Sequence, residues 1–210
     1  MNEYVWYASY GSNLLRERFL CYIQGGQPEG TNKIYSGCTD KALPIDDEEF
    51  YINSELYFAK ESDSWNKGGV GFIRTTFDPG TQTLARMYLI TQAQLTDVIR
   101  QETNNPNALS IDFNTVILGG SLIFKKYSWY GNMIYLGNQN EHPIFTFTNE
   151  NDIQPINRPD VNYLKLIIKG MDETFHYNIP GIVDYLISKQ GVVGNYTSAQ
   201  LIDICNDAHQ

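Results

Sequence analysis

The residues best suited to chemistry form a run near the N-terminus: Tyr10, Gly11, Ser12, Asn13 and Leu14. The apolar residues 4–8 predict a buried strand before the run, and residues 14–23 predict a helix that ends at a pair of glycines. The run is therefore expected to be a tight turn from a strand into a helix. Such a turn directs free backbone N–H groups and the positive end of the helix dipole at one small volume. A carboxylate would fit there.

Glu102 is the second candidate for chemistry. A capping box predicts a helix over residues 91–104. Because Glu102 follows Val98 by four positions and Ile99 by three, it is predicted to lie on the same inward face as these apolar residues. It also lies in the last turn, where the helix dipole disfavours an anion. A carboxylate held at such a cost is a candidate general base. The alternative is a frayed helix end, with Glu102 pointing at solvent.

Other catalytic patterns are weak or missing in the sequence. Ser12 lies outside the G-x-S-x-G pattern of serine hydrolases. The three histidines, at positions 142, 176 and 209, have no regular spacing that would indicate a metal site. Neither of the two common phosphate-binding glycine motifs occurs. The sequence therefore predicts neither a metal nor a cofactor.

Composition limits the partners and the location. The net charge of −9 makes nucleic acid and anionic membranes poor partners. No apolar stretch reaches the roughly 20 residues that a membrane-spanning helix needs. No targeting segment is recognised, so the predicted location is the cytoplasm. The three cysteines are too scattered to indicate disulfides or a zinc site. No pattern indicates the oligomeric state.

Short β-rich segments dominate the first two-thirds of the chain. The predicted strands after the first cover residues 50–59, 70–76, 83–90, 115–118, 121–127, 132–136 and 144–148. Many short strands with close turns favour an antiparallel or mixed sheet that closes on itself. After residue 153 the pattern changes to three helical segments. We therefore predict a sheet domain over residues 1–152 and a helical extension over residues 153–210.

The start of the chain resembles the γ-glutamylcyclotransferase-like family. Residues 5–14 match its signature, an aromatic strand that ends in Y-G-S-N-[LM]. The strand at residues 85–90, followed by a helix that ends in Glu102, is similar to the second motif of the family. Many members have glycine after this glutamate, whereas this chain has Thr103. Tyr135 is the best match to a tyrosine that often lines the family pocket. The resemblance covers roughly residues 4–148, and the helical tail resembles that of longer bacterial relatives.

This resemblance implies an α+β fold, namely a small mixed β-barrel with flanking helices, here with a C-terminal helical appendage. It implies a cofactor-free reaction in which a small-molecule γ-glutamyl substrate cyclises to 5-oxoproline and releases an amine or amino acid. Glu102 would be the general acid and base, and the turn with Tyr135 would bind the substrate. Two alternatives stay open. One alternative is a non-catalytic domain that binds a small acid or a protein. The other is a related amide hydrolase.

Overall fold

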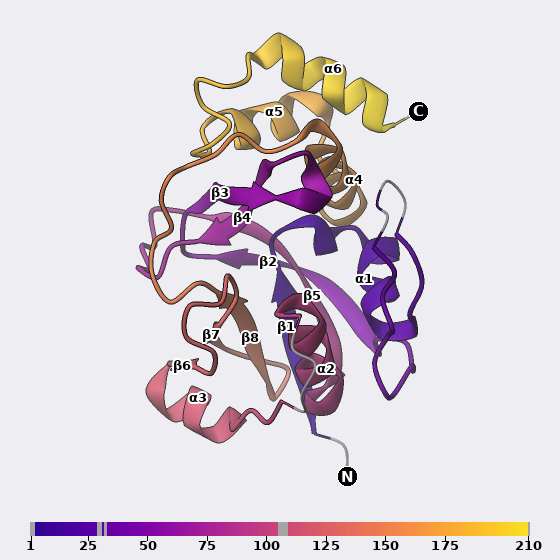
Figure 1. Ribbon diagram of the computed structural model, residues 1–210, viewed down its shortest axis with the longest axis vertical. Helices are drawn as coiled ribbons and strands as arrows, with labels where there is room; N and C mark the ends of the chain where they lie inside the picture. The colour runs from indigo at the N-terminus through magenta and orange to yellow at the C-terminus, as the bar shows by residue number, and fades with distance from the viewer. Residues whose placement is uncertain (1–2, 29–30, 32, 105–108, 210) are drawn as a thin grey trace.

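The architecture is built on a mixed β-sheet with helices on both of its faces (Figure 1). The computed structural model describes residues 3–28, 31, 33–104 and 109–209. The strands are β1 (Tyr4–Ser9), β2 (Asp46–Ile52), β3 (Leu56–Ser62), β4 (Gly68–Ile73), β5 (Thr83–Thr91), β6 (Ser121–Ile123), β7 (Asn132–Gln139) and β8 (His142–Thr148). The helices are α1 (Arg16–Gln24), α2 (Gln92–Glu102), α3 (Phe113–Gly119), α4 (Val161–Phe175), α5 (Ile179–Ile187) and α6 (Ser198–Ala208).

Six strands form the main sheet in the order β2-β5-β1-β8-β7-β6. The central strand β1 is antiparallel to β5 and parallel to β8, so the sheet is mixed. Strands β3 and β4 form a separate two-stranded hairpin, which single bridges join to Ile156, Pro159 and Gln190. Within the described residues no pairing joins the edge strands β2 and β6. The fold class is therefore α+β as predicted, but the predicted barrel is an open sheet.

Two predicted strands are corrected by local turn and cap chemistry. The predicted strand 50–59 is interrupted at Ser54, whose N–H donates to the carbonyl of Ile52 at 2.8 Å, and this turn separates β2 from β3. The predicted strand 115–118 is helix α3. Its β-branched residues favour a strand, but Asp112 caps the helix by accepting the N–H of Thr115, and Gly120 ends it with a φ of 75°.

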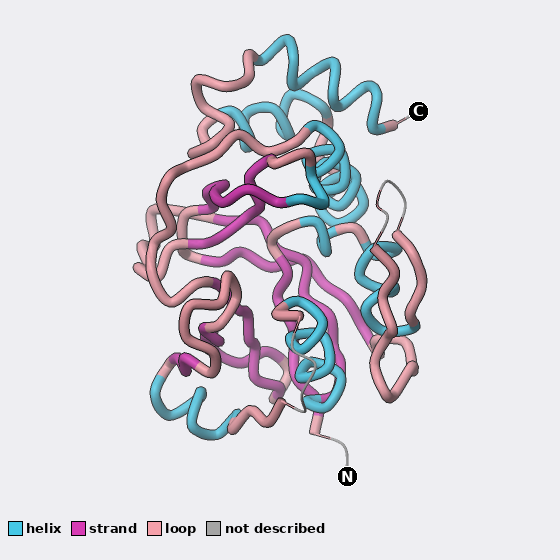
Figure 2. Tube along the Cα trace, in the orientation of Figure 1, coloured by secondary structure: helices cyan, strands magenta, loops and turns pink. Residues whose placement is uncertain are grey.

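The two faces of β1 enter two hydrophobic cores. Trp6 and Ala8 face a core shared with β3, β4 and the C-terminal helices α4, α5 and α6. Val5 and Tyr7, on the opposite face, join a core with α1, α2 and α3. This alternation follows from the two-residue period of a strand. Figure 2 shows α4, α5 and α6 together at the top of the view, whereas α1, α2 and α3 are spread around the lower strands.

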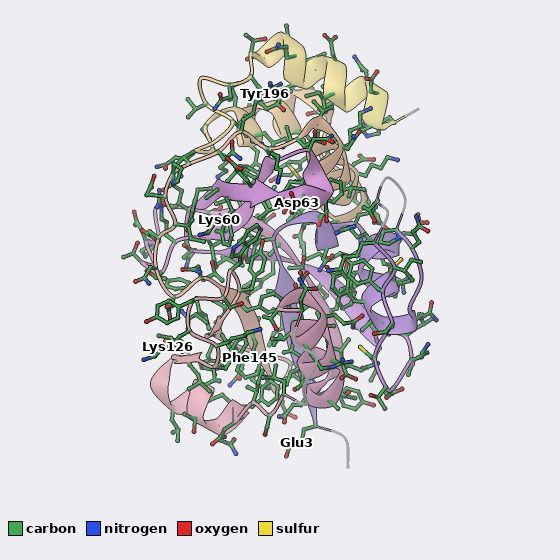
Figure 3. All side chains as sticks on the ribbon, viewed as in Figure 1. Glu3, Lys60, Asp63, Lys126, Phe145 and Tyr196 are labelled. Carbon is green, nitrogen blue, oxygen red and sulfur yellow. The ribbon has the colours of Figure 1, made fainter. Side chains whose placement is uncertain are left out.

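The C-terminal helices are an integral part of the first core. Tyr196, just before α6, is buried there, whereas Phe145 lies in the second core next to α3 (Figure 3). A capping box at Thr197 begins α6, and Pro180 lies in the first turn of α5. The division into domains at residues 152 and 153 stays a prediction. No helix in the described part of the chain is both long enough and apolar enough to cross a membrane.

Candidate functional site

The predicted turn lies between β1 and α1. A single turn of 3-10 helix, η1 (Ser12–Leu14), follows Gly11, and α1 begins only at Arg16. The predicted helix start at residue 14 is therefore two residues early. The N–H of Leu14 donates to the carbonyl of Gly11 at 3.0 Å. That amide is used inside the turn, and the amides before it are the ones that a ligand can meet.

Buried hydrogen bonds fix the turn from behind. The Tyr88 hydroxyl donates to the carbonyl of Asn13 at 2.8 Å, and Arg86 donates to the carbonyl of Leu14 at 3.4 Å. The Tyr10 hydroxyl donates to the carbonyl of Phe147 at 2.9 Å, which ties the turn to β8. Because Tyr88 and Arg86 come from the long buried strand β5, the turn is held by the centre of the sheet.

Helix α4 presses on the same turn from the other side. Gly170 packs so closely that a Cβ atom built there would lie 2.5 Å from the Cβ of Leu14 and 2.5 Å from the backbone nitrogen of Leu15. Only glycine permits this approach. The Leu14 side chain is 1% exposed and points into the first core, away from the pocket. Leu14 therefore supports the turn and does not line the pocket, which differs from the sequence prediction.

Glu102 meets the turn although 89 positions separate it from Asn13 in sequence. It is the last residue of α2, and its Oε1 accepts a hydrogen bond from Asn13 Nδ2 at 3.3 Å. The capping box that begins this helix at Thr91 is present as predicted. The Glu102 side chain is half-buried and lines the pocket, which is the inward arrangement of the two alternatives that the sequence left open.

Thr103, where the sequence departs from the family pattern, fits its position without strain. Its φ is −88°, a value that any residue adopts, so glycine is not needed there. Its N–H and its hydroxyl both donate to the carbonyl of Ile99 at 2.9 Å. Thr103 thus closes the end of α2 and leaves Glu102 free to face the pocket.

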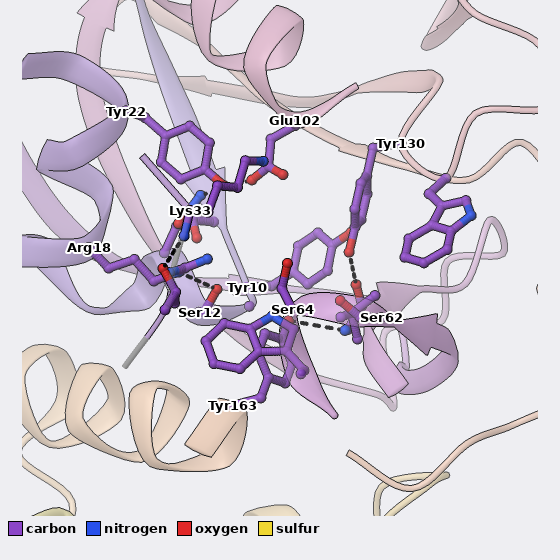
Figure 4. A pocket seen from close by; sticks show the side chains of 18 of the residues that line it. Tyr10, Ser12, Arg18, Tyr22, Lys33, Ser62, Ser64, Glu102, Tyr130 and Tyr163 are labelled. Carbon is purple, nitrogen blue, oxygen red and sulfur yellow. Dashed lines mark hydrogen bonds between the residues drawn. The ribbon is translucent and has the colours of Figure 1, made fainter. Parts of the chain in front are cut away.

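The pocket between the turn and Glu102 has a volume of about 180 Å³. Tyr10, Gly11, Ser12 and Asn13 from the turn line it together with Glu102. Its walls are largely aromatic, and they include Tyr7, Tyr22, Trp65, Tyr130, Phe147 and Tyr163. In Figure 4, Glu102 and Tyr163 enter from opposite sides, with Arg18 and Tyr130 on the two flanks. A small polar molecule with an acyl chain fits such a space.

The phenols of the wall stay protonated at neutral pH. Burial raises the pKa of Tyr7 and of Tyr22, and the negative charge of Glu102 raises both further. Burial likewise raises the pKa of Tyr130 and of Tyr163. These hydroxyls therefore act as neutral hydrogen-bonding groups around Glu102, and at neutral pH they add no negative charge to the pocket.

Tyr135 does not reach this pocket. It lies on β7, where its hydroxyl donates to Asn138 Oδ1 at 3.0 Å and its ring packs on Phe145. One of the tyrosines that do line the pocket is Tyr163 of α4, whose hydroxyl accepts the N–H of Gly71 at 3.1 Å. Sequence reasoning missed Tyr163 because it lies in the segment predicted to be an extension. Within the sequence, only its position in the apolar stripe of α4 indicated that Tyr163 is buried.

The described residues contain no group of three or more histidine, cysteine, aspartate or glutamate side chains that could hold a metal ion. What the pocket offers is one carboxylate, two basic side chains (Arg18 and Lys33), the backbone of the turn and a set of neutral hydroxyls. A carboxylate that faces anchored amides can exchange a proton with a bound substrate.

Comparisons with known proteins agree with the fold. A solved γ-glutamyl cyclotransferase superposes with a TM-score of 0.52 at 16% identity, covering 98% of this chain and 99% of that one. An uncharacterised protein from Homo sapiens superposes with a TM-score of 0.53 at 17% identity, covering 99% of each chain. At this identity the likeness shows the fold alone, which is that of the γ-glutamyl cyclotransferases. No family model matches the sequence.

One curated protein is more similar in sequence. Histone deacetylase 5 from Arabidopsis thaliana is 35% identical over 190 residues, which is 80% of this chain and 28% of that protein. This chain thus spans about a quarter of the length of its curated relative, and most of that relative lies outside the matched region.

Proposed function

We propose that this chain, whose fold is that of the γ-glutamyl cyclotransferases, cyclises a γ-glutamyl amide or peptide to 5-oxoproline and releases an amine or amino acid. The hydrogen bond between Asn13 and Glu102 carries the proposal, because it joins the turn and the acidic helix end in one pocket. The fold is supported independently by two solved structures of nearly the same extent.

In this proposal Glu102 is the general base and then the general acid. Its carboxylate takes a proton from the α-amino group of the substrate, and the nitrogen attacks the γ-carbonyl carbon. A carbon–nitrogen bond forms in the five-membered ring as the bond to the leaving nitrogen breaks. Glu102 then returns the proton to the leaving amine. Since the attack is intramolecular, the protein needs mainly to hold the substrate in a folded conformation.

The turn would hold the γ-glutamyl group. Tyr10, Gly11, Ser12 and Asn13 line the pocket, and the amides that precede Leu14 are placed to donate to an oxygen of the substrate. Leu14 contributes by closing the turn and filling the core behind it. Because the turn is already fixed by Tyr88 and Arg86, binding requires little reorganisation.

The test is product formation from γ-glutamyl dipeptides and γ-glutamyl amines, with 5-oxoproline measured by chromatography. Glu102→Gln keeps the shape and the acceptor oxygen of the side chain but cannot take the proton. We expect it to lower kcat by at least about 100-fold. Glu17→Gln changes an exposed glutamate on α1 and is the matched control, with unchanged kcat.

Two outcomes would contradict the proposal. One is the absence of 5-oxoproline with every substrate, which would favour a binding domain. The other is full activity of the Glu102→Gln variant. Release of free glutamate in place of the cyclic product would show hydrolysis, the remaining alternative.

A further inference from the structure

Arg18 is a buried cation in the pocket wall that has only neutral partners. Its side chain comes from α1 and the residue is 6% exposed. Its Nε donates to Ser12 Oγ at 2.8 Å, and its Nη2 donates to the Tyr35 hydroxyl at 3.3 Å (Figure 4). Its Nη1 is buried and has no hydrogen-bond partner among the residues that the structure describes. Burial raises the pKa of Tyr35, which keeps that hydroxyl neutral.

A second arginine shows how this fold treats a buried guanidinium elsewhere. Arg86 is also 6% exposed, but it forms ion pairs with Asp47 and, at 2.9 Å, with Glu173. Arg18 has no such pair within the described residues. The guanidinium carbon lies 5.3 Å from the ring centre of Trp65, a contact that offsets only part of the cost of burial.

An unpaired buried charge is costly, and a bound anion removes that cost. Both Glu102 and Arg18 line the pocket, and no direct ion pair joins them in the described part of the chain, although the charge of Glu102 acts to raise the pKa of Arg18. Asn13 lies beside Glu102, and its Oδ1 is a second buried atom without a hydrogen-bond partner. The pocket thus presents the Arg18 cation, whose Nη1 is an unused donor. Apart from it lies the Glu102 carboxylate, with the unused acceptor Asn13 Oδ1 beside it.

This pattern is complementary to the head of an α-amino acid, in which an ammonium and a carboxylate group share one carbon. We infer that Arg18 binds the α-carboxylate of the γ-glutamyl group, so that a free α-carboxylate is required of every substrate. The inference rests on the proposed function and narrows it. Amides of 4-aminobutyrate-type acids, and γ-glutamyl compounds whose α-carboxylate is converted to an amide, would be poor substrates.

The first test compares a γ-glutamyl substrate with its α-carboxamide analogue, which has the same shape without the charge. We expect the wild-type kcat/KM to be roughly 30-fold lower for the analogue, the effect of losing one charge-assisted hydrogen bond. Arg18→Gln should lower kcat/KM about as much for the carboxylate substrate, mainly through KM, and leave the analogue unchanged. Arg18→Lys should restore part of the preference.

Arg158→Gln is the matched control. Arg158 also stacks on an aromatic ring, with its guanidinium carbon 4.3 Å from the ring centre of Tyr196, but it is exposed and does not line the pocket. This variant should keep the full preference for the carboxylate substrate. If Arg158→Gln lowered the preference as much as Arg18→Gln, the assignment to Arg18 would be wrong.

A binding measurement separates this inference from the proposed function. Calorimetry with 5-oxoproline and with its carboxamide needs no turnover, and the wild type should prefer the acid by a similar factor. If the acid is preferred through Arg18 but no substrate is cyclised, the inference holds and the proposed function fails. Equal binding of the two by the wild type, or binding of neither, overturns the inference even if substrates are cyclised. If the Arg18→Gln variant does not fold, the inference is still tested by the preference of the wild type for the acid over the carboxamide and by the same preference in the Arg18→Lys variant.

Discussion

The two halves of the candidate site are built in different ways. The turn is fixed on several sides, since Tyr88 and Arg86 hold its carbonyls and Gly170 of α4 packs against its backbone. The backbone at the end of α2 is anchored through Gln101 and Thr103, but the Glu102 side chain is held lightly by comparison. Glu102 has one hydrogen bond to the turn, at 3.3 Å, and its side chain is half-buried.

This difference matches the two tasks of an acyl transfer site. A group that binds substrate gains from being fixed before the substrate arrives, because no free energy is then spent on ordering it. A group that first takes and then returns a proton must serve two positions on the substrate, and a half-buried side chain at a helix end can move between them. The rigid half and the adjustable half should therefore respond differently to substitution.

The largest effect is expected from Gly170→Ala, which acts on the rigid half. The added methyl group would lie 2.5 Å from atoms of Leu14 and Leu15, so the turn or α4 must move. We expect the free energy of unfolding to fall by about 2 kcal/mol, although alanine favours a helix more than glycine does. Thermal melting, with an expected fall in Tm of about 5 °C, measures this effect. The kcat of the variant should fall as well.

Gly181→Ala is the control for this prediction. Gly181 lies in α5, where a Cβ would lie 3.3 Å from Asn178 Oδ1, at the end of that side chain, and in ordinary contact with Tyr177 at 3.7 Å. That substitution should be neutral or raise the free energy of unfolding by up to about 1 kcal/mol. A Gly170→Ala variant as stable as the wild type would mean that the turn is not clamped by α4.

The sequence predicted the parts of this site that depend on neighbours along the chain. The turn after β1 and the capping box at Thr91 follow from spacings of a few residues, and the inward position of Glu102 was one of the two alternatives that its spacing left open. Parts that depend on distant segments were missed. Strands β3 and β4 form a sheet apart from the main one, and the strand-like run at Val116 is helical with Asp112 as its cap. Neither a sheet edge nor a competing cap is visible in hydrophobic periodicity.

Arg18 and Tyr163 show the same limit within the site. No sequence pattern distinguishes Arg18 on its helix, and only packing against Trp65 and Tyr35 shows that it is buried. Tyr163 reads as one more apolar position of α4, because nothing local indicates that α4 crosses the turn. The burial of Arg18 and the position of Tyr163 in the pocket both depend on tertiary contacts between distant segments.

A smaller effect is expected from Asn13→Ala, which breaks the single hydrogen bond between the two halves. We expect kcat to fall about tenfold, the value of one hydrogen bond to a charged group, because Glu102 loses the contact that orients it. The free energy of unfolding should change by less than about 1 kcal/mol, since Asn13 Oδ1 is already without a partner. Asn138→Ala on the surface of β7 should change neither quantity. If the Asn13→Ala variant lost stability but kept its kcat, Asn13 would support the fixed turn and would not orient Glu102.

The smallest effect is expected from Tyr135→Phe, which tests where the pocket ends. The Tyr135 hydroxyl contacts only Asn138, so its removal should change the free energy of unfolding by less than about 0.5 kcal/mol and leave kcat/KM unchanged. Tyr163→Phe is the informative comparison, because it leaves the N–H of Gly71 without its buried acceptor and removes a hydroxyl from the pocket. That variant should lose about 1–2 kcal/mol of stability and several-fold in kcat/KM. If Tyr135→Phe were instead the impaired variant, the substrate would have to extend along β7, and the pocket bounded by Tyr163 would not be the whole site.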